Sequence, residues 1–587
     1  MTLPFKSNDP TLPDGPAPEL PADHPRARKR KRRRRALLLL IALIVYLLYA
    51  YWADEYGITV SPETTYLTGP LRPDGTVDYF RALQERLSEG ITPENNAAPL
   101  LLRAFGPRGV PEDARDDILA QLGLPSLPED GRYFTNLWDY ADSLPSAERA
   151  ALLGGSSVID EYDWLVVKAR GGPWSAERHP LLARWLAAND LALALVVQAS
   201  QRPHSRFPLI ESKQSPWRTG LSFSTVHGKL HDAVRALTAR AQLRLSGDDW
   251  RGALQDVLAC HRLARVLAQE GLLEVVTATA LEALVCQTDI GMVTSGRLSP
   301  DELRALLFEL QQLRPMRRPA DALMATSRLA GLAFTTALAR GYDIDAFFPQ
   351  PVMSANGEFD VVFSPSHQGD VRYPLQWDVI LRMQNEHYNR LIKAMNLARF
   401  SDSLAACEQI EQEVAPEEQA PTGLFRMLSE LINWLNSLRG VSASPAPGKT
   451  GLGKDIERFK AAARLSRWGG RPLRGYASRQ AGRVLLRMAG VQGSGRLRAL
   501  HEWAAMYGEL TRLAIALELY KHDEGQYPDR LAAVALTYVK AVPLDRFVDK
   551  PLEYRRVGKG YLLYSVGLNQ IDDGGINADD DIVVQVK

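Results

Sequence analysis

The chain has 587 residues, of which 45% are apolar and 24% are charged, proportions that are ordinary for a globular protein. A formal net charge of only +1 argues against a single polyanionic partner for the whole chain. The three cysteines form no CxxC pair, which excludes zinc-finger spacing. A chain of this length is expected to form several domains.

The N-terminal segment, residues 1–35, begins rich in proline and ends in the basic run RARKRKRRRR. This composition predicts a disordered basic tail. No aromatic side chains interleave with the basic ones, so we expect no nucleic-acid partner. A basic run directly before a membrane helix more commonly sets topology and contacts anionic headgroups.

Residues 36–52, ALLLLIALIVYLLYAYW, contain no charged side chain. As a helix they would span roughly 26 Å, close to the roughly 30 Å hydrocarbon core of a bilayer. No small-residue cleavage site follows, which favours an uncleaved anchor over a signal peptide. We therefore predict one transmembrane helix that contacts the lipid bilayer through residues 36–52. The basic run places the N-terminus in the cytoplasm, which predicts a single-pass protein of the cell (inner) membrane with its bulk in the periplasm.

Residues 54–490 show mainly helical periodicity and predict a large extracytoplasmic α-helical domain. The clearest unit, residues 227–271, reads as two helices joined by an SGDD turn. This unit resembles a tetratricopeptide hairpin, but no 34-residue period is sustained. The prediction is an irregular body with solenoid-like hairpins. Residues 411–423 and 440–454 read as linkers.

A loop over residues 343–374 interrupts the helical pattern with prolines, glycines and phenylalanines. Connections of this length are usually functional or disordered. The phenylalanines either line a groove or pack into the core, and the second is the favoured interpretation. One alternative for the whole protein therefore stays open: a membrane-tethered hydrolase with its site between the helical body and this loop.

The sequence contains no complete catalytic motif: neither GxSxG nor GxGxxG occurs. His227 and His231 have the spacing of an HExxH zinc site, but Gly228 replaces the glutamate that would act as base. Two packing or surface histidines are the favoured interpretation. An enzymatic role is uncertain on this evidence, and a non-enzymatic protein is favoured.

The last segment, residues 495–587, changes pattern. An apolar-striped helix ends near Gly525, an alternating hairpin turns through Gly558 and Gly560, and DIVVQV closes the chain as a third strand. The overall prediction is a mainly α protein: a transmembrane helix, a large helical body and a small α+β C-terminal domain with a three-stranded antiparallel sheet. The acidic stretch NQIDDGGINADDD connects the second and third strands of that sheet.

The motifs LYKHDEGQYP, VPLDRFVDKPLEY, YLLYSVG and DDDI follow one another in an order that resembles the globular domain of the major pseudopilin of type II secretion, the G protein. The resemblance implies a calcium-binding loop before the last strand, with Asn569 and either Asp579 or Asp581 at ligand positions. The chain lacks a prepilin-peptidase motif, so we expect a pseudopilin-like head and no filament subunit. The whole chain also resembles membrane-anchored envelope proteins of planctomycete-type bacteria, a group that supplies no activity to carry over.

The acidic connection is the predicted metal site. It offers carboxylate, amide and carbonyl oxygens, which suit Ca²⁺, and it lacks the histidine and sulfur ligands of zinc and copper. The alternative is a solvated acidic turn. The candidate ligands are Asn569, Asp572, Asp573, Asn577, Asp579 and Asp581. Taken together, the sequence predicts a membrane-anchored extracytoplasmic protein that contacts envelope or secretion proteins.

Overall fold

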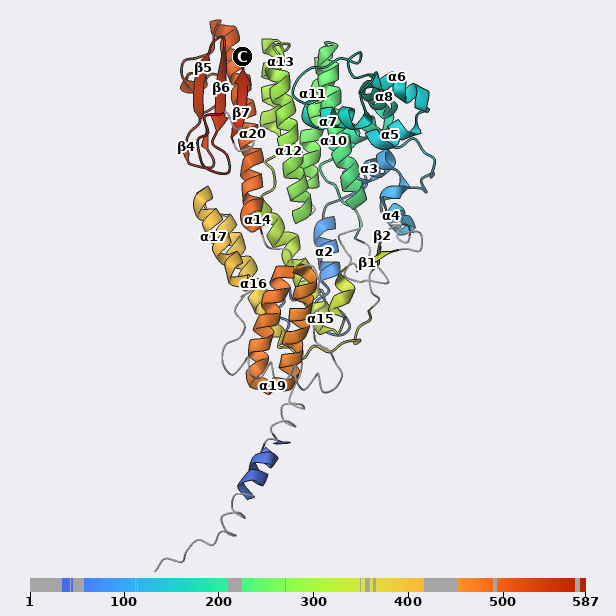
Figure 1. Cartoon of the computed structure of the whole chain (residues 1–587), viewed down its shortest axis with the longest axis vertical. Coiled ribbons are helices and arrows are strands. Elements are labelled where there is room, and N and C mark those ends of the chain that lie inside the picture. The colour runs from blue at the N-terminus through green and yellow to red at the C-terminus, as the bar shows by residue number, and fades with distance from the viewer. Residues whose placement is uncertain are drawn as a thin grey trace, which may run out of the picture.

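The structure is a computed structural model, and it describes residues 34–42, 44–45, 57–110, 112, 115–209, 224–269, 271–348, 350–353, 359–362, 366–415, 451–488, 493–575 and 581–587. Within these residues the protein is mainly α-helical and carries small antiparallel sheets at its C-terminal end, as predicted. Figure 1 shows an elongated body with the C-terminal sheet at one end and α19 at the other.

The elements have the following bounds. Up to residue 200 the helices are α2 (Tyr79–Ser88), α3 (Ala98–Phe105), η1 (Pro107–Gly109), α4 (Arg115–Gln121), α5 (Leu137–Ser143), α6 (Ser146–Leu153), α7 (Val158–Val167), α8 (Pro180–Ala188) and α9 (Asp190–Ser200). The later helices are α10 (Ser224–Ser246), α11 (Trp250–Leu267), α12 (Leu272–Val293), α13 (Pro300–Gln312), α14 (Pro319–Ala322), the π-helical turn η4 (Leu323–Ser327), α15 (Arg328–Ala339), η5 (Ile344–Phe347), α16 (Trp377–Met395), α17 (Phe400–Val414), α19 (Gly451–Met488), α20 (Ser494–Glu524) and η6 (Leu531–Val534). The strands are β1 (Gln350–Met353), β2 (Phe359–Val362), β3 (Leu544–Asp545), β4 (Lys550–Pro551), β5 (Glu553–Val557), β6 (Gly560–Ser565) and β7 (Ile582–Val586).

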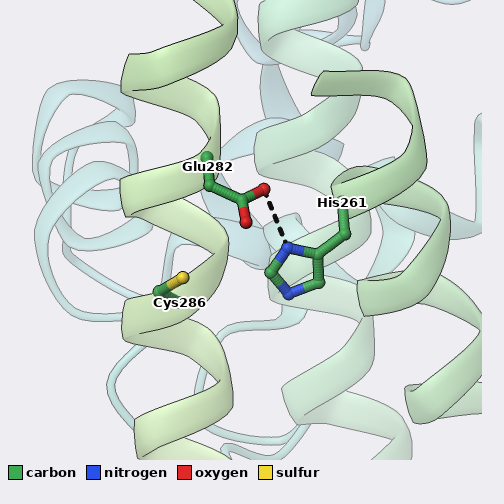
Figure 2. A group of neighbouring side chains, drawn as sticks. All are labelled: His261, Glu282 and Cys286. Carbon is green, nitrogen blue, oxygen red and sulfur yellow. Dashed lines mark hydrogen bonds and ion pairs between the residues drawn. The ribbon is translucent and has the colours of Figure 1, made fainter. Parts of the chain in front are cut away.

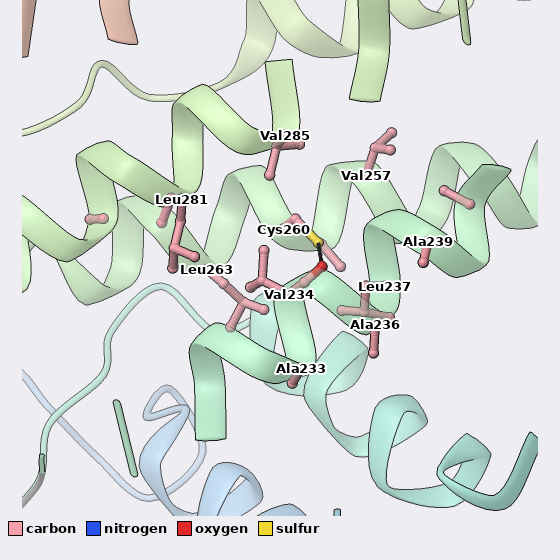
Figure 3. Packing of buried hydrophobic residues seen from close by; sticks show 14 of the residues in the cluster. Ala233, Val234, Ala236, Leu237, Ala239, Val257, Cys260, Leu263, Leu281 and Val285 are labelled. Atoms are coloured by element: carbon pink, nitrogen blue, oxygen red, sulfur yellow. Dashed lines mark hydrogen bonds between the residues drawn. The ribbon is translucent and has the colours of Figure 1, made fainter. Parts of the chain in front are cut away.

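The helical hairpin predicted over residues 227–271 is present as α10 and α11. Asp249 begins α11 as its N-cap, because its side chain accepts a hydrogen bond from the amide of Gly252. Small residues on α10 let the two helices approach closely, and Figure 3 shows Ala233 and Ala236 within the buried cluster around Cys260. All three cysteines are free and buried.

Helix α19 folds back on itself. Asp455 and Arg487 form an ion pair of 2.8 Å, although a straight helix would place residues this far apart in sequence at opposite ends of roughly 48 Å. The reversal lies near the Gly-Gly-Arg-Pro sequence at residues 469–472, whose residue types favour a break in a helix. Figure 1 shows the two arms of α19 side by side at one end of the body.

The C-terminal segment shares its core with the body. One hydrophobic cluster extends from Ala97 to Val584, and α20 contributes to it while packing against α12 and α13. The three-stranded antiparallel sheet has the order β5-β6-β7, and every residue of β6 is buried. The predicted sheet is therefore present, and its helix is at the same time a helix of the body.

Both predicted linkers overlap with helices. Residues 411–414 complete α17, because Ile410 and Val414 continue its buried face, and residues 451–454 begin α19. The remainder of the predicted linkers lies outside the described residues. The short helix η6 begins without a side-chain cap, and the nearby Asp529 pairs with Arg556 at 2.8 Å.

Candidate functional site

The described part of the predicted anchor is an exposed apolar helix. Residues 36–42 and 44–45 are helical, and Leu37 to Ile41, Ile44 and Val45 each expose about half or more of their surface. Contiguous apolar surface of this kind indicates a membrane or protein contact in a folded chain. Residue 43 and residues 46–52 lie outside the described residues.

Among the described residues, the run Pro319–Ala339 is long and apolar enough to cross a membrane. A bent pair, Pro180–Ala188 with Asp190–Ser200, meets the same test only if it is taken as one span. In Pro319–Ala339, 67% of the most apolar 18-residue stretch is buried inside the protein. Such burial is typical of a helix in the core of a folded domain.

The acidic connection before β7 forms a series of side-chain-capped turns. Asn569 accepts a hydrogen bond at Oδ1 from the amide of Ile571 (2.8 Å) and donates through Nδ2 to Asp573 (3.3 Å). Asp572 Oδ1 accepts from the amide of Gly574 and from the hydroxyl of Tyr564, both at 2.9 Å. Asn569 and Asp572 are exposed, and Asp573 is half-buried. These three candidate ligands therefore already have protein partners.

Asp581 has a different environment from the other candidates, because it is buried at the start of the last strand. Its Oδ2 accepts from the amide of Gly575 at 2.9 Å and so ties the loop to the sheet. Gly574 and Gly575 have φ of 76° and 69°, the left-handed conformation that glycine adopts without strain. Asn577 and Asp579, the remaining candidates, lie outside the described residues.

The loop supplies oxygen ligands of the right chemistry for Ca²⁺, which takes six to eight oxygens. The described carboxylates do not, however, converge by themselves. Within the described part of the chain, the one group of three histidine, cysteine or acidic side chains whose ligand atoms lie within 4.8 Å of one another is His261, Glu282 and Cys286. Any calcium ion in the loop would need the carbonyl oxygens, or the two candidates in residues 576–580, to complete its shell.

Of the histidine pair in the incomplete HExxH pattern, the structure describes the side chain of His231. His231 is half-buried, and burial together with Arg235 lowers its pKa to about 4. The side chain of His227 lies outside what the structure describes.

A buried ionic cluster joins α11 to α12. Figure 2 shows His261 facing Glu282 and Cys286. Its Nδ1 lies 2.9 Å from Glu282 Oε2, and its Nε2 lies 2.8 Å from Asp289 Oδ2. Arg265 holds the two oxygens of Glu282 at 2.7 and 2.9 Å. The side chains of the cluster are all largely buried: His261, Arg265, Glu282, Cys286 and Asp289. Each buried charge is therefore stabilised by the oppositely charged group beside it.

The electrostatics of this cluster favour a protonated imidazole. Burial by itself lowers the pKa of His261, but Glu282 and Asp289 outweigh burial and raise the pKa to about 9. Burial likewise opposes the charged form of Glu282, yet His261 and Arg265 lower its pKa to about 2. Burial raises the pKa of Asp289 against the lowering effect of His261, and it raises the pKa of the Cys286 thiol.

The cluster is therefore neutral overall without a bound ion, because the positive charges of His261 and Arg265 offset the negative charges of Glu282 and Asp289. A transition metal at His261, Glu282 and Cys286 would require a thiolate, which burial disfavours. It would also displace one of the two imidazole protons that pair His261 with Glu282 and Asp289. The arrangement suits a structural ionic lock between two helices. The sequence signal for this cluster is the i, i+4, i+7 spacing of Glu282, Cys286 and Asp289, which places them on one face of α12. Sequence reasoning missed the cluster because its histidine lies on another helix.

A second buried network joins α10 to α11. Asp256 is fully buried and accepts from Arg240 through both carboxylate oxygens, at 2.8 and 3.0 Å. Arg244 approaches the same carboxylate at 2.9 Å, and Arg240 also reaches Asp190 at 2.8 Å. The aspartate that suggested a tetratricopeptide-like hairpin is thus the centre of an ion network between α10 and α11.

Phe347, from the loop over residues 343–374, lines a small, mainly apolar hollow of about 120 Å³. Tyr79, Leu83, Phe334 and Phe347 are among its lining residues, and no histidine, cysteine or carboxylate is. Phe347 packs edge-on against Phe334 at a centroid distance of 4.5 Å, so this half-buried residue both packs against the core and lines the hollow. A hydrolytic site would need converging acids or bases, and the described lining of this hollow supplies none.

Comparison of the chain with family models, with curated proteins and with solved structures gives no match.

Proposed function

We propose that the protein is a single-pass, membrane-anchored envelope protein whose helical body holds a pseudopilin-like C-terminal head away from the bilayer for contact with other envelope or secretion proteins. The observation that carries this proposal is the exposed apolar helix at residues 36–45, which follows a run of arginines. An apolar helix of this kind is covered in a membrane, and the arginines orient it.

The arrangement of the body is consistent with a presenting role. Near its first described residues after the anchor, the chain is fixed to the start of α16 by the hydrogen bond from the amide of Thr59 to Asp378, and α16 packs against α19. Figure 1 shows the sheet β5-β6-β7 at the end of the body opposite α19. The apolar lining of the hollow beside Phe347 suits binding of an apolar group, and the two buried ion networks tie neighbouring helices of the body together, which supports a binding or scaffolding role. The pseudopilin-like assignment rests on the motif order in the sequence together with the helix and three antiparallel strands.

A topology reporter tests the anchor. An alkaline phosphatase, which is active only outside the cytoplasm, is fused after Lys587, and we expect activity in intact cells together with carbonate-resistant membrane association. As a matched control, the same fusion without residues 36–52 should be inactive and soluble. Activity of a cytoplasm-only reporter at Lys587 would show that the proposed orientation is wrong.

The proposal includes Ca²⁺ as a ligand of the loop between β6 and β7. Ca²⁺ would join Asn569 to the end of the loop at Asp581 and relieve repulsion among the clustered carboxylates. We expect millimolar Ca²⁺ to raise the melting temperature of the β5-β6-β7 segment and to slow proteolysis of the loop, with chelator reversing both effects. Asn569→Ala and Asp581→Ala should each reduce the shift, whereas Asp529→Ala, a surface control, should not. An unchanged melting temperature and proteolysis rate would favour the solvated acidic turn.

A further inference from the structure

We propose that the end of the body nearest the anchor binds anionic lipid headgroups through Arg372, Arg464 and Arg467. This inference rests on the proposed membrane anchor and adds a lipid class to it. The three side chains line one open hollow between the loop before α16 and the first arm of α19, together with Lys460 and Asp343. A hollow lined by several guanidinium groups offers the forked donors that match phosphate oxygens.

The arginines of the hollow carry uncompensated charge. All three are exposed, and none is paired with a carboxylate in the part of the chain that the structure describes. The one hydrogen bond of the Arg467 guanidinium goes to the carbonyl oxygen of Arg372, at 3.3 Å. The nearby acids are already engaged: Asp345 pairs with Lys460 at 2.5 Å, and Asp343 accepts from a tyrosine hydroxyl at 3.0 Å. Positive charge is therefore in excess at the hollow.

The hollow lies close to the point where the chain enters the body. The amide of Thr59 donates to Asp378 Oδ1 at 2.9 Å, which fixes the incoming chain at the start of α16. Four residues earlier, the carbonyl oxygen of Pro374 accepts from the hydroxyl of Ser466, the residue next to Arg467. Because four residues span at most about 14 Å, this turn of α19 lies near the incoming chain.

The length of chain from the anchor sets the distance to the bilayer. If the membrane helix ends at Trp52, the five residues to Gly57 reach at most about 18 Å. The headgroup layer itself adds roughly 5–7 Å to each side of the hydrocarbon core. The end of the body that contains the hollow is thus held against the headgroups, where free phosphate has no comparable advantage of proximity. The site is therefore assigned to lipid phosphate.

The expected strength follows from the charge. A basic side chain near an anionic membrane surface strengthens association roughly fivefold, and the attraction falls off within a Debye length of about 8 Å at physiological salt. Three arginines therefore give a strong and salt-sensitive preference for anionic over zwitterionic lipid.

Residue-level arginine footprinting tests the proposal on the full chain. The protein is reconstituted in nanodiscs of phosphatidylcholine alone or with about one third phosphatidylglycerol, and phenylglyoxal labelling is followed by mass spectrometry. We expect labelling of the three arginines to slow at least roughly fivefold in the anionic nanodiscs. High salt should restore the rate.

Internal controls come from the same chain. Arg178, Arg251 and Arg530 are exposed and form no ion pair in the described structure, and they lie on other parts of the molecule. Their labelling should be equal in the two lipids. A variant carrying R372Q, R464Q and R467Q should retain less co-purified phosphatidylglycerol than one carrying R178Q, R251Q and R530Q.

The outcomes separate this inference from the anchor itself. Equal labelling of the hollow in both lipids, with the protein incorporated in the nanodiscs, would overturn lipid binding and leave the anchor intact. Equal protection by inorganic phosphate in phosphatidylcholine nanodiscs would overturn it in favour of a free-phosphate site. Failure of the chain to incorporate would contradict the anchor first, and with it the geometry on which the headgroup proposal depends.

Discussion

The buried cluster of α11 and α12 gives the sharpest prediction. Among the described residues, His261 is the one charged partner within hydrogen-bonding distance of Asp289, and replacing it by leucine removes that partner. Arg265 still holds Glu282 at both oxygens. A buried carboxylate left without its partner destabilises a protein by about 3–5 kcal/mol. His261→Leu should therefore lower the free energy of unfolding by about that amount.

Adding Asp289→Leu to His261→Leu should recover much of the lost free energy of unfolding. The variant His261→Leu with Asp289→Leu leaves no unpaired buried charge, because the remaining pair of Glu282 and Arg265 is intact. Replacement of a buried ionic group and its partner by apolar residues is often close to neutral. The double variant is thus expected to be more stable than the single one, with a coupling of roughly 2 kcal/mol or more.

The same cluster predicts a dependence on pH. The pKa of His261 is raised from 6.5 to about 9 in the folded protein. The stabilisation is therefore fully present below about pH 6.5 and is lost as pH rises through 9, up to about 3 kcal/mol in total. For Glu282 the pKa is lowered to about 2, so its contribution is present above about pH 4.5 and is lost as pH falls towards 2.

Urea denaturation of residues 54–587, followed by circular dichroism between pH 6 and 10, measures these effects. We expect the wild type to lose stability between pH 7 and 9.5, and the double variant to lose less over the same interval. Strictly additive effects of the two substitutions, or an unchanged pH slope in the double variant, would refute the ionic lock.

Two further predictions concern packing and charge elsewhere. Asp256→Ala should cost about 3–5 kcal/mol by leaving buried Arg240 without its bidentate partner. Asp248→Asn is an exposed control in the adjoining turn, where asparagine tolerates the φ of 60°, and it should stay within about 0.5 kcal/mol in the same urea assay. Gly560→Ala should loosen the pairing of β6 with β7, because a Cβ there would lie 1.9 Å from the carbonyl oxygen of Val586. Faster amide hydrogen exchange in β7 would show this loosening. An unchanged exchange rate would contradict the close approach.

Local pattern was sufficient to predict several elements of this protein. The hairpin α10–α11 followed from apolar periodicity and the Ser-Gly-Asp-Asp turn, because these act within a few residues of chain. The strands β5, β6 and β7 followed from alternation and from glycines at the turn, for the same reason. The predicted linkers were wrong at their edges because helix boundaries depend on which apolar residues find a neighbour, as Ile410 and Val414 do.

The candidate sites depended on contacts between distant segments, and the sequence could not supply these. His261 meets Glu282 and Asp289 only because α11 and α12 lie antiparallel, and Asp581 reaches Gly575 only when β7 pairs with β6. The arginine hollow likewise joins two segments about ninety residues apart. Composition and periodicity determine which segments form helices and strands. The pairing of buried charges depends on tertiary packing, since a charge is tolerated inside a protein only where another part of the chain brings its partner.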